Sequence, residues 1–248
     1  MKRLLKLILT CVLVLSLTLM NTGVTFASSD LSKTLIFGDS RTKLMSYHVT
    51  GKLVKKGLYK SETNDVKYWL YKSGSGFDYF YGQLNNITKL VKKGKVKNII
   101  IWYGVNDAMR TSCDSDFVAS LYATELNRLA KGDWKNCNIY YASVGYIDTY
   151  KVHKVYTKNG VYTWDNSNRW IENFNISLQT QLDSSIKFID INSVVTEKTG
   201  ISSVDTTERT QSDDKFWMKN KNHGNRHDGL HYTKSISKAI YDKMISQL

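Results

Sequence analysis

Ser40 is the first residue whose type and setting could support nucleophilic chemistry. It lies in the cluster Gly38–Arg41, directly after the apolar run Thr34–Phe37. A serine at a strand-to-helix turn exposes its hydroxyl and directs its backbone amide into the same space, as an acyl-transfer site needs. The alternative is a helix N-cap in which Asp39 is the partner of Ser40.

Asn106 belongs to a second polar cluster, Gly104–Asp107, which follows the most hydrophobic run of the sequence, 98–103. A side-chain amide held there could donate to an oxyanion as negative charge develops. Glycine, asparagine and aspartate also favour turns, so the same cluster could simply end a strand.

His231 and Asp228 form the third cluster, with Gly229 between them. An imidazole titrates near neutral pH and serves as a general base when an acceptor fixes its other nitrogen. We expect Asp228 to fold back onto His231 across a tight turn that contains Gly229. His227 is less favoured as the base because it adjoins Asp228 and points elsewhere. The alternative is that Asp228 or Thr233 caps the last helix.

The elements that must position these clusters alternate between short apolar runs and longer helical patterns. Residues 146–168 and 193–227 lack clean periodicity and are expected to be irregular excursions. The pattern predicts a three-layer α/β/α sandwich with a central, mostly parallel five-stranded sheet, whose strand ends would gather the polar clusters. The expected strands are 34–37, 66–71, 98–103, 138–144 and 186–191, and the expected helices are 79–92, 115–129, 170–182 and 233–248.

These three clusters, in this order, resemble the blocks of the SGNH (GDSL-type) hydrolase family: GDS at 38–40, GxND at 104–107 and DxxH at 228–231. The resemblance extends from residue 34 to the end of the chain and implies a flavodoxin-like fold. It implies a triad of Ser40 as nucleophile, His231 as base and Asp228 as the residue that orients the base.

The resemblance also implies an oxyanion hole made by the backbone amides of Ser40 and a glycine and by the side chain of Asn106. Gly74, ten residues before Leu84, is the expected glycine, and Gly76 is the alternative. Both could instead be loop glycines that serve only the turn. No cofactor and no metal are expected.

The activity that the resemblance implies is hydrolysis of O-acyl esters through an acyl-enzyme. We expect a secreted serine esterase that removes acyl groups, foremost acetyl, from carbohydrates or cell-wall polymers. The alternatives are a lipase or lysophospholipase, an O-acyltransferase, and a non-catalytic wall-binding protein on the same fold. The aromatic side chains of the two excursions, Trp217 among them, could stack on sugar rings or merely cover a sheet edge.

The N-terminus reads as a signal peptide over residues 1–27, followed by a single domain over 28–248. Positive residues precede an uncharged apolar run at 7–20, and small residues lie before a cut after Ala27. An uncleaved anchor is the rival interpretation, although the run is short for a bilayer. The predicted location is extracellular, with cell-wall association as a further expectation.

The charge of the chain bears on its partners, and its cysteines bear on a disulfide. The net charge of +13 falls to +10 without residues 1–27, which carry three positive and no negative charges. This charge suits an anionic wall surface or solubility alone, and no nucleic acid is expected as a partner. Cys113 and Cys137 could form one disulfide or remain two thiols. We expect a monomer.

Overall fold

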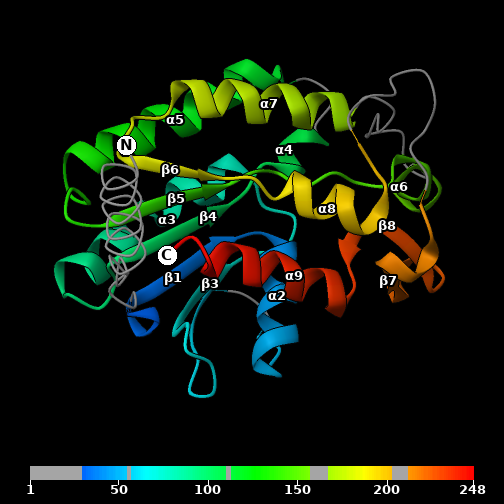
Figure 1. Cartoon of the computed structure of the whole chain (residues 1–248), viewed down its shortest axis with the longest axis horizontal. Coiled ribbons are helices and arrows are strands. Elements are labelled where there is room, and N and C mark those ends of the chain that lie inside the picture. Colours follow the sequence, from blue (N-terminus) through cyan, green and yellow to red (C-terminus); the bar gives the residue numbers. More distant parts are fainter. Residues whose placement is uncertain (1–29, 55–56, 110–112, 157–166, 203–211) are drawn as a thin grey trace, which may run out of the picture. The chain divides into compact units, whose positions relative to one another are not determined.

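The computed structural model describes residues 30–54, 57–109, 113–156, 167–202 and 212–248, and Leu31–Leu248 form one compact unit (Figure 1). The predicted signal peptide, 1–27, lies outside the described residues. Within them, no helix combines the length and the apolar character needed to cross a bilayer.

The central sheet has six strands in the order β2-β3-β1-β4-β5-β6. All neighbouring pairs are parallel except β2 with β3, so the expected mostly parallel sheet is confirmed. The strands are β1 (Thr34–Gly38), β2 (Gly57–Lys60), β3 (Tyr68–Tyr71), β4 (Asn98–Trp102), β5 (Asn138–Ala142) and β6 (Ile186–Ile189).

The expected count of five strands is wrong because β2 escaped the sequence pattern. This strand has only four residues, and its side chains alternate between half-buried and exposed positions at the sheet edge. It pairs antiparallel to β3, with Tyr59 opposite Trp69. A short edge strand needs no continuous apolar run, and that run is the signal by which the buried strands were found.

Helices cover both faces of the sheet, which confirms the three-layer α/β/α sandwich (Figure 1). One layer contains α3, α5 and α7, in which α5 packs against both α3 and α7; the other contains α2, α8 and α9, in which α9 packs against both α2 and α8. The bounds are α2 (Ser40–Thr50), α3 (Phe77–Lys92), α4 (Val105–Ala108), α5 (Ser115–Lys131), α6 (Thr149–Tyr156), α7 (Ser167–Gln181), α8 (Asn192–Thr199) and α9 (Lys234–Ile245), with short 3-10 turns at Leu31–Lys33, Asp214–Phe216 and Lys221–His223.

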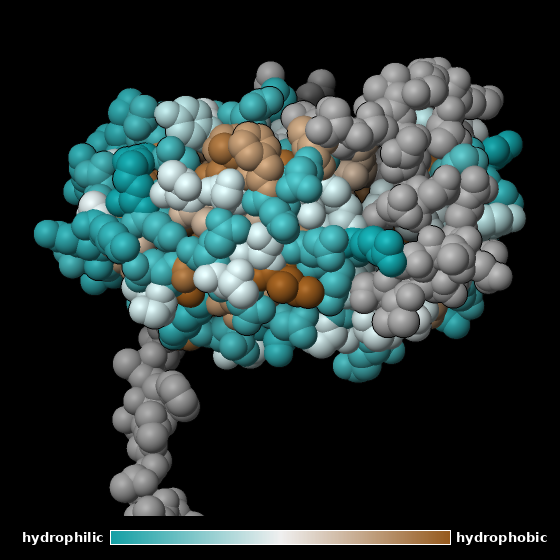
Figure 2. All heavy atoms as spheres, turned by 90° about the horizontal axis from the view of Figure 1, so that it is seen from above, coloured by the Kyte–Doolittle hydropathy of each residue, from teal (hydrophilic) through white to brown (hydrophobic). Residues whose placement is uncertain are grey.

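The core is centred on β4, in which all five residues are buried. A strand enclosed by helices on both faces must be apolar on both sides, which explains the run Ile99–Ile101. Aromatic rings pack between the sheet and the helices, with Phe37 and Tyr103 edge to face at 4.9 Å between ring centroids. On the surface shown in Figure 2, hydrophobic residues occur only in small separate groups among hydrophilic ones.

Both predicted excursions contain regular structure. Residues 146–168 include α6, and 193–227 include α8 and the strand β7 (Trp217–Asn220), which pairs antiparallel with β8 (Arg226–Tyr232). The inward face of α6 includes the polar residues Thr149 and Lys151, which hides the apolar period of an amphipathic helix. The hairpin is equally hidden because β8 carries Arg226, His227 and Asp228.

Two further expectations are settled by packing. Cys113 and Cys137 are free thiols. They lie beyond opposite ends of α5, whose 17 residues span about 25 Å at 1.5 Å per residue, a length that no disulfide bridges. Trp217 is 1% exposed and Tyr146 is 6% exposed, so neither is an open stacking platform. Tyr162 and Trp164 of the same set lie outside the described residues.

Candidate active site

Ser40 lies at the first position of α2, where β1 ends. The Asp39 carboxylate caps this helix, and its Oδ1 accepts the backbone N–H of Arg41 at 2.8 Å. The turn is tight, because a Cβ on Gly38 would lie 2.5 Å from the carbonyl oxygen of Trp102. Amides in a first helical turn have no intrahelical acceptor, so the Ser40 N–H is available to an oxyanion.

His231 and Asp228 lie within β8 and not on the expected tight turn. Gly229 between them has φ of 69°, a left-handed conformation that β-strand residues with side chains avoid. This kink lets Asp228 Oδ1 accept the backbone N–H groups of both Leu230 and His231 at 2.9 Å. The local backbone therefore holds the carboxylate under the imidazole three residues later.

The three predicted triad residues meet in one chain of hydrogen bonds. His231 Nε2 lies 2.8 Å from Ser40 Oγ, and His231 Nδ1 lies 2.6 Å from Asp228 Oδ2. Burial alone would raise the pKa of Asp228, but the hydrogen bond and charge of His231, with the two backbone amides, hold this pKa below its ordinary value. The carboxylate therefore stays ionised beneath the imidazole, as a residue that stabilises an imidazolium must.

Asn106, on the short helix α4, reaches the same place from the end of β4. Its Nδ2 donates to Asp39 Oδ2 at 3.1 Å and to the carbonyl oxygen of Ser75 at 3.0 Å. Both amide hydrogens are thus engaged, so donation to an oxyanion requires a bifurcated bond or release of one of these acceptors. Asp107 accepts the backbone N–H of Phe77 at 3.1 Å and the Tyr122 hydroxyl at 3.0 Å, which fixes the turn around Asn106.

Asp39 is buried beneath the site. Desolvation, opposed by the charge of Arg41, raises the pKa of the Asp39 carboxyl from 3.8 to about 6. Because this carboxylate accepts from Asn106, its ionisation state affects how firmly the side chain of Asn106 is held.

The two candidate glycines occupy different surroundings. Gly74 lines the same pocket as Ser40, Asn106 and His231. Gly76 instead packs on Asp107, whose carboxyl carbon would lie 2.7 Å from a Cβ at this position. The geometry thus favours Gly74 over Gly76 as a group near the nucleophile.

Arg41, the residue after Ser40, is buried and only 3% exposed. Its Nε donates to the carbonyl oxygen of Leu230 at 3.1 Å, and a terminal nitrogen donates to that of Gly145 at 2.7 Å. The guanidinium also lies over the Tyr232 ring, 4.7 Å from its centroid. The residue after Ser40 is therefore bound to the residue before His231, which fixes α2 against β8.

The pocket above Ser40, here called the serine pocket, has a volume of about 280 Å³. His227 does not line this pocket, and its Nδ1 lies 2.7 Å from the carbonyl oxygen of Trp217. The lining includes Tyr156, which the sequence placed among the aromatic side chains of the excursion 146–168 but did not connect with Asp228, because only the tertiary fold brings α6 to that residue. The serine pocket is lined by Ser40, Ser73, Gly74, Asn106, Met109, Tyr156, Leu230 and His231.

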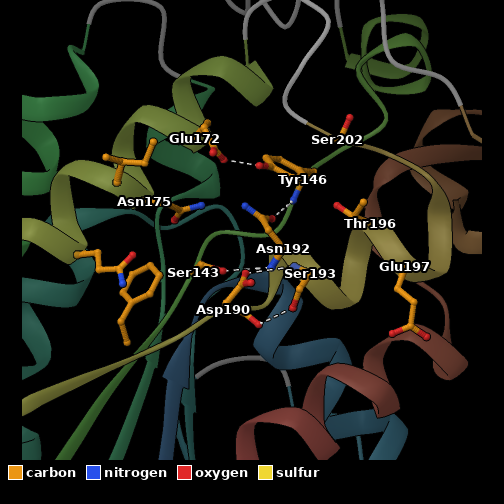
Figure 3. Close-up of a pocket in the computed structure, with 13 residues that line it drawn as sticks. Ser143, Tyr146, Glu172, Asn175, Asp190, Asn192, Ser193, Thr196, Glu197 and Ser202 are labelled. Atoms are coloured by element: carbon orange, nitrogen blue, oxygen red, sulfur yellow. Dashed lines mark hydrogen bonds between the residues drawn. The ribbon is translucent and has the colours of Figure 1, made fainter.

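A larger hollow of about 760 Å³, here called the polar groove, lies at the ends of β5 and β6 (Figure 3). It contains none of the predicted site residues. Carboxylates, amides and hydroxyls dominate its lining: Ser143, Tyr146, Glu172, Asn175, Ile176, Gln179, Phe188, Asp190, Asn192, Ser193, Thr196, Glu197 and Ser202. Across the described ranges, no group of three or more His, Cys, Asp or Glu side chains is arranged to hold a metal ion.

Comparison with known proteins identifies the fold. No family model matches the sequence, and no curated protein matches it either. Among solved structures, 27 chains are similar. One is a Streptococcus pneumoniae protein described as a platelet activating factor, with a TM-score of 0.54, 13% identity, and coverage of 91% of this chain and 86% of the other.

Two further neighbours carry descriptions of the expected class. A lipase/acylhydrolase from Enterococcus faecalis has a TM-score of 0.51, 15% identity, and coverage of 87% of this chain and 94% of the other. A protein from Desulfitobacterium hafniense described as a lipolytic member of the G-D-S-L family has a TM-score of 0.50, 11% identity, and coverage of 88% and 99%. At such identities the likeness establishes the fold alone, a three-layer α/β/α sandwich that this chain shares with a described G-D-S-L family protein.

Proposed function

We propose that this protein is an SGNH-type serine ester hydrolase with Ser40 as nucleophile, His231 as base and Asp228 as the residue that orients the base. One observation carries the proposal: the continuous hydrogen-bonded chain from Ser40 Oγ through the imidazole to Asp228, at 2.8 and 2.6 Å. Hydroxyl, imidazole and carboxylate in this order form the arrangement that activates serine for acyl transfer.

The reaction follows from this geometry. His231 Nε2 takes the Ser40 proton as the oxygen attacks an ester carbonyl, and Asp228 stabilises the resulting imidazolium. The backbone amides of Ser40 and Gly74, with the side chain of Asn106, would donate to the oxyanion. The protonated His231 then gives its proton to the leaving alcohol, and a water activated by the same imidazole releases the acyl group.

For the substrate, we favour O-acetyl esters on carbohydrates or cell-wall polymers. The serine pocket, at about 280 Å³, lies at the lower end of the usual range of ligand sites, which suits a short acyl group. The net charge of +10 that remains without residues 1–27 suits an anionic wall surface. Export directed by residues 1–27 would bring the enzyme to such substrates. Aromatic stacking no longer supports this choice, since Trp217 and Tyr146 are buried.

A lipolytic acylhydrolase is the second candidate, favoured by the printed descriptions of the Enterococcus and Desulfitobacterium neighbours. The two candidates differ in acyl length. We expect a series of chromogenic esters to be cleaved fastest with acetyl, and at least about tenfold slower from octanoyl onward, because a longer chain exceeds the serine pocket. A preference for long chains would contradict the acetyl proposal and support the lipolytic one.

The activity itself is tested with a fluorescent serine-reactive phosphonate. The wild-type protein should be labelled, and Ser40→Ala should not. Ser73→Ala is the matched control, because Ser73 lines the same pocket and has no imidazole partner among the described contacts. Equal labelling of wild type and Ser40→Ala would overturn the proposed nucleophile.

A further inference from the structure

The hydrogen-bonded chain of the site does not end at Asp228. The Tyr156 hydroxyl donates to Asp228 Oδ2 at 3.2 Å, and this is the same oxygen that accepts from His231 Nδ1. Behind it, Asn220 Nδ2 donates to the Tyr156 oxygen at 3.0 Å. The chain therefore runs from β7 through the end of α6 to the carboxylate on β8.

Chemistry fixes the direction of each bond in this chain. An ionised carboxylate can only accept, so the phenol must give its proton to Asp228. The Tyr156 oxygen can in turn accept a hydrogen bond, and the Asn220 amide group supplies the donor. The Asn220 amide cannot turn over without loss, because its Oδ1 accepts the backbone N–H of Asn222 at 3.0 Å.

The segments that carry this chain are anchored to one another. The backbone N–H of Asp148, just before α6, donates to the carbonyl oxygen of Gly229 at 2.9 Å. The buried Lys151 of α6 pairs with Asp148 at 3.0 Å and with Asp214, ahead of β7, at 3.2 Å. A Cβ at Gly229 would lie 2.5 Å from the Asp148 carbonyl oxygen, so α6 rests directly on the strand that holds the carboxylate.

We propose that Tyr156 is a positioning residue for Asp228 and that Asn220 sets the direction of the Tyr156 hydroxyl. The inference rests on the proposed function. With Tyr156 in place, Asp228 Oδ2 receives donors from two directions while Oδ1 is held by two backbone amides, so the carboxylate cannot rotate away from His231. Without Tyr156, His231 would be the one side chain among the described residues that still donates to Oδ2.

The pKa of the Tyr156 hydroxyl agrees with a hydrogen bond donated from Tyr156 to Asp228. Burial and the neighbouring charge of Asp228 raise the pKa of the Tyr156 hydroxyl, so the phenol keeps the proton that it donates. The charged groups that act on the neighbouring Asp39 carboxyl are Arg41, His231 and Asp107.

The test compares Tyr156→Phe, which removes only the hydroxyl, with Tyr150→Phe on the same helix. We expect Tyr156→Phe to lower kcat about tenfold with little change in KM, because a hydrogen bond to a charged group is lost while the ring still lines the pocket. The acid limb of the pH profile of kcat/KM should move to lower pH, because a carboxylate that can rotate away from His231 stabilises the imidazolium less. Tyr150→Phe should change neither quantity.

Asn220→Asp gives an independent test. A carboxylate at position 220 would accept the phenol proton and withdraw it from Asp228, so kcat should fall as far as in Tyr156→Phe. Combining Asn220→Asp with Tyr156→Phe should then add little, since both remove one interaction.

Two results would overturn the inference: an unchanged kcat and pH profile in Tyr156→Phe, or fully additive losses in the double variant. Phosphonate labelling separates a failure of this inference from a failure of the proposed function. If the wild-type protein is labelled at Ser40, these two results contradict only the role of Tyr156. If the wild-type protein is not labelled, the proposed function itself is contradicted.

Discussion

The serine pocket and the polar groove are both lined by polar side chains at the ends of strands, but these side chains have different hydrogen-bond partners in the two places. In the polar groove, Asn175 Oδ1 accepts the backbone N–H of Val144 at 2.8 Å, and its Nδ2 donates to the Val144 carbonyl at 3.0 Å. Ser143 Oγ accepts the backbone N–H of Ile191 at 2.7 Å. These groups hold loops, and Figure 3 shows a second such bond, from the backbone N–H of Asn192 to Ser143 Oγ.

In the serine pocket the side chains of Ser40, His231 and Asp228 bind one another and end on a hydroxyl that faces the hollow. The polar groove is the larger of the two, so volume does not separate them. What separates them is whether polar groups satisfy the backbone or form a chain that can move a proton. The same type of substitution should therefore lower kcat in the serine pocket and lower the free energy of unfolding in the polar groove.

The largest contrast is expected between two serines. Ser40→Ala should lower kcat by about 10⁴- to 10⁶-fold on a chromogenic acetyl ester, because the nucleophile is lost. Ser143→Ala should leave kcat unchanged and lower the free energy of unfolding by about 1–3 kcal/mol, because the Ile191 amide loses its acceptor. Kinetics and urea unfolding of both variants measure the difference. A large loss of kcat in Ser143→Ala would break the comparison.

The next contrast is between two asparagines. Asn106→Ala should reduce kcat about 100- to 1,000-fold, the usual effect of losing an oxyanion donor. Asn175→Ala should keep the kcat of the folded enzyme and lower the free energy of unfolding by about 2–4 kcal/mol, because both backbone groups of Val144 lose partners. If Asn106→Ala retains wild-type kcat, the Asp39 and Ser75 bonds are its whole role.

The smallest effect concerns Asp39, the buried carboxyl under the serine pocket, whereas Asp190 and Glu197 of the polar groove are exposed. Between its ordinary pKa of 3.8 and about 6, Asp39 is ionised in the unfolded chain but protonated in the folded protein. Its contribution to stability is therefore full below about pH 4 and falls as the pH rises to about 6, by on the order of 2–3 kcal/mol.

Urea unfolding of Asp39→Asn and wild type at several pH values isolates this contribution, since the variant cannot ionise. The free energy of unfolding of the variant relative to wild type should rise between pH 4 and 6 and then level off. A difference that stays constant across this range would show that burial does not raise the pKa of Asp39.

The sequence predicted what depends on local pattern. Continuous apolar runs such as Ile99–Ile101 identified the buried strands, and the order of the blocks around Ser40, Asn106 and His231 predicted that these residues meet. The short edge strand β2 was missed because half of its side chains face solvent. The burial of Arg41 could not be predicted because its acceptors are backbone carbonyls of distant segments.

Tyr156 and Asn220 could not be predicted for a related reason. The bond between Tyr156 and Asp228 joins residues 72 positions apart. The spacing of residues around Tyr156 or around Asp228 gives no sign of this bond. The helix that carries Tyr156 was itself hidden, because its inward face includes a lysine whose charge is matched by Asp148 only in the folded protein.

The hydrogen bonds of Arg41 have a consequence for how the proposed hydrolase could diversify. Both of its acceptors are main-chain oxygens, which every amino acid supplies, so no replacement at positions 145 or 230 removes an acceptor atom. Leu230 also forms part of the wall of the serine pocket. Its side chain can therefore be exchanged to admit a different acyl group while the imidazole beside it keeps its alignment with the nucleophile, so selectivity and reactivity are free to evolve separately.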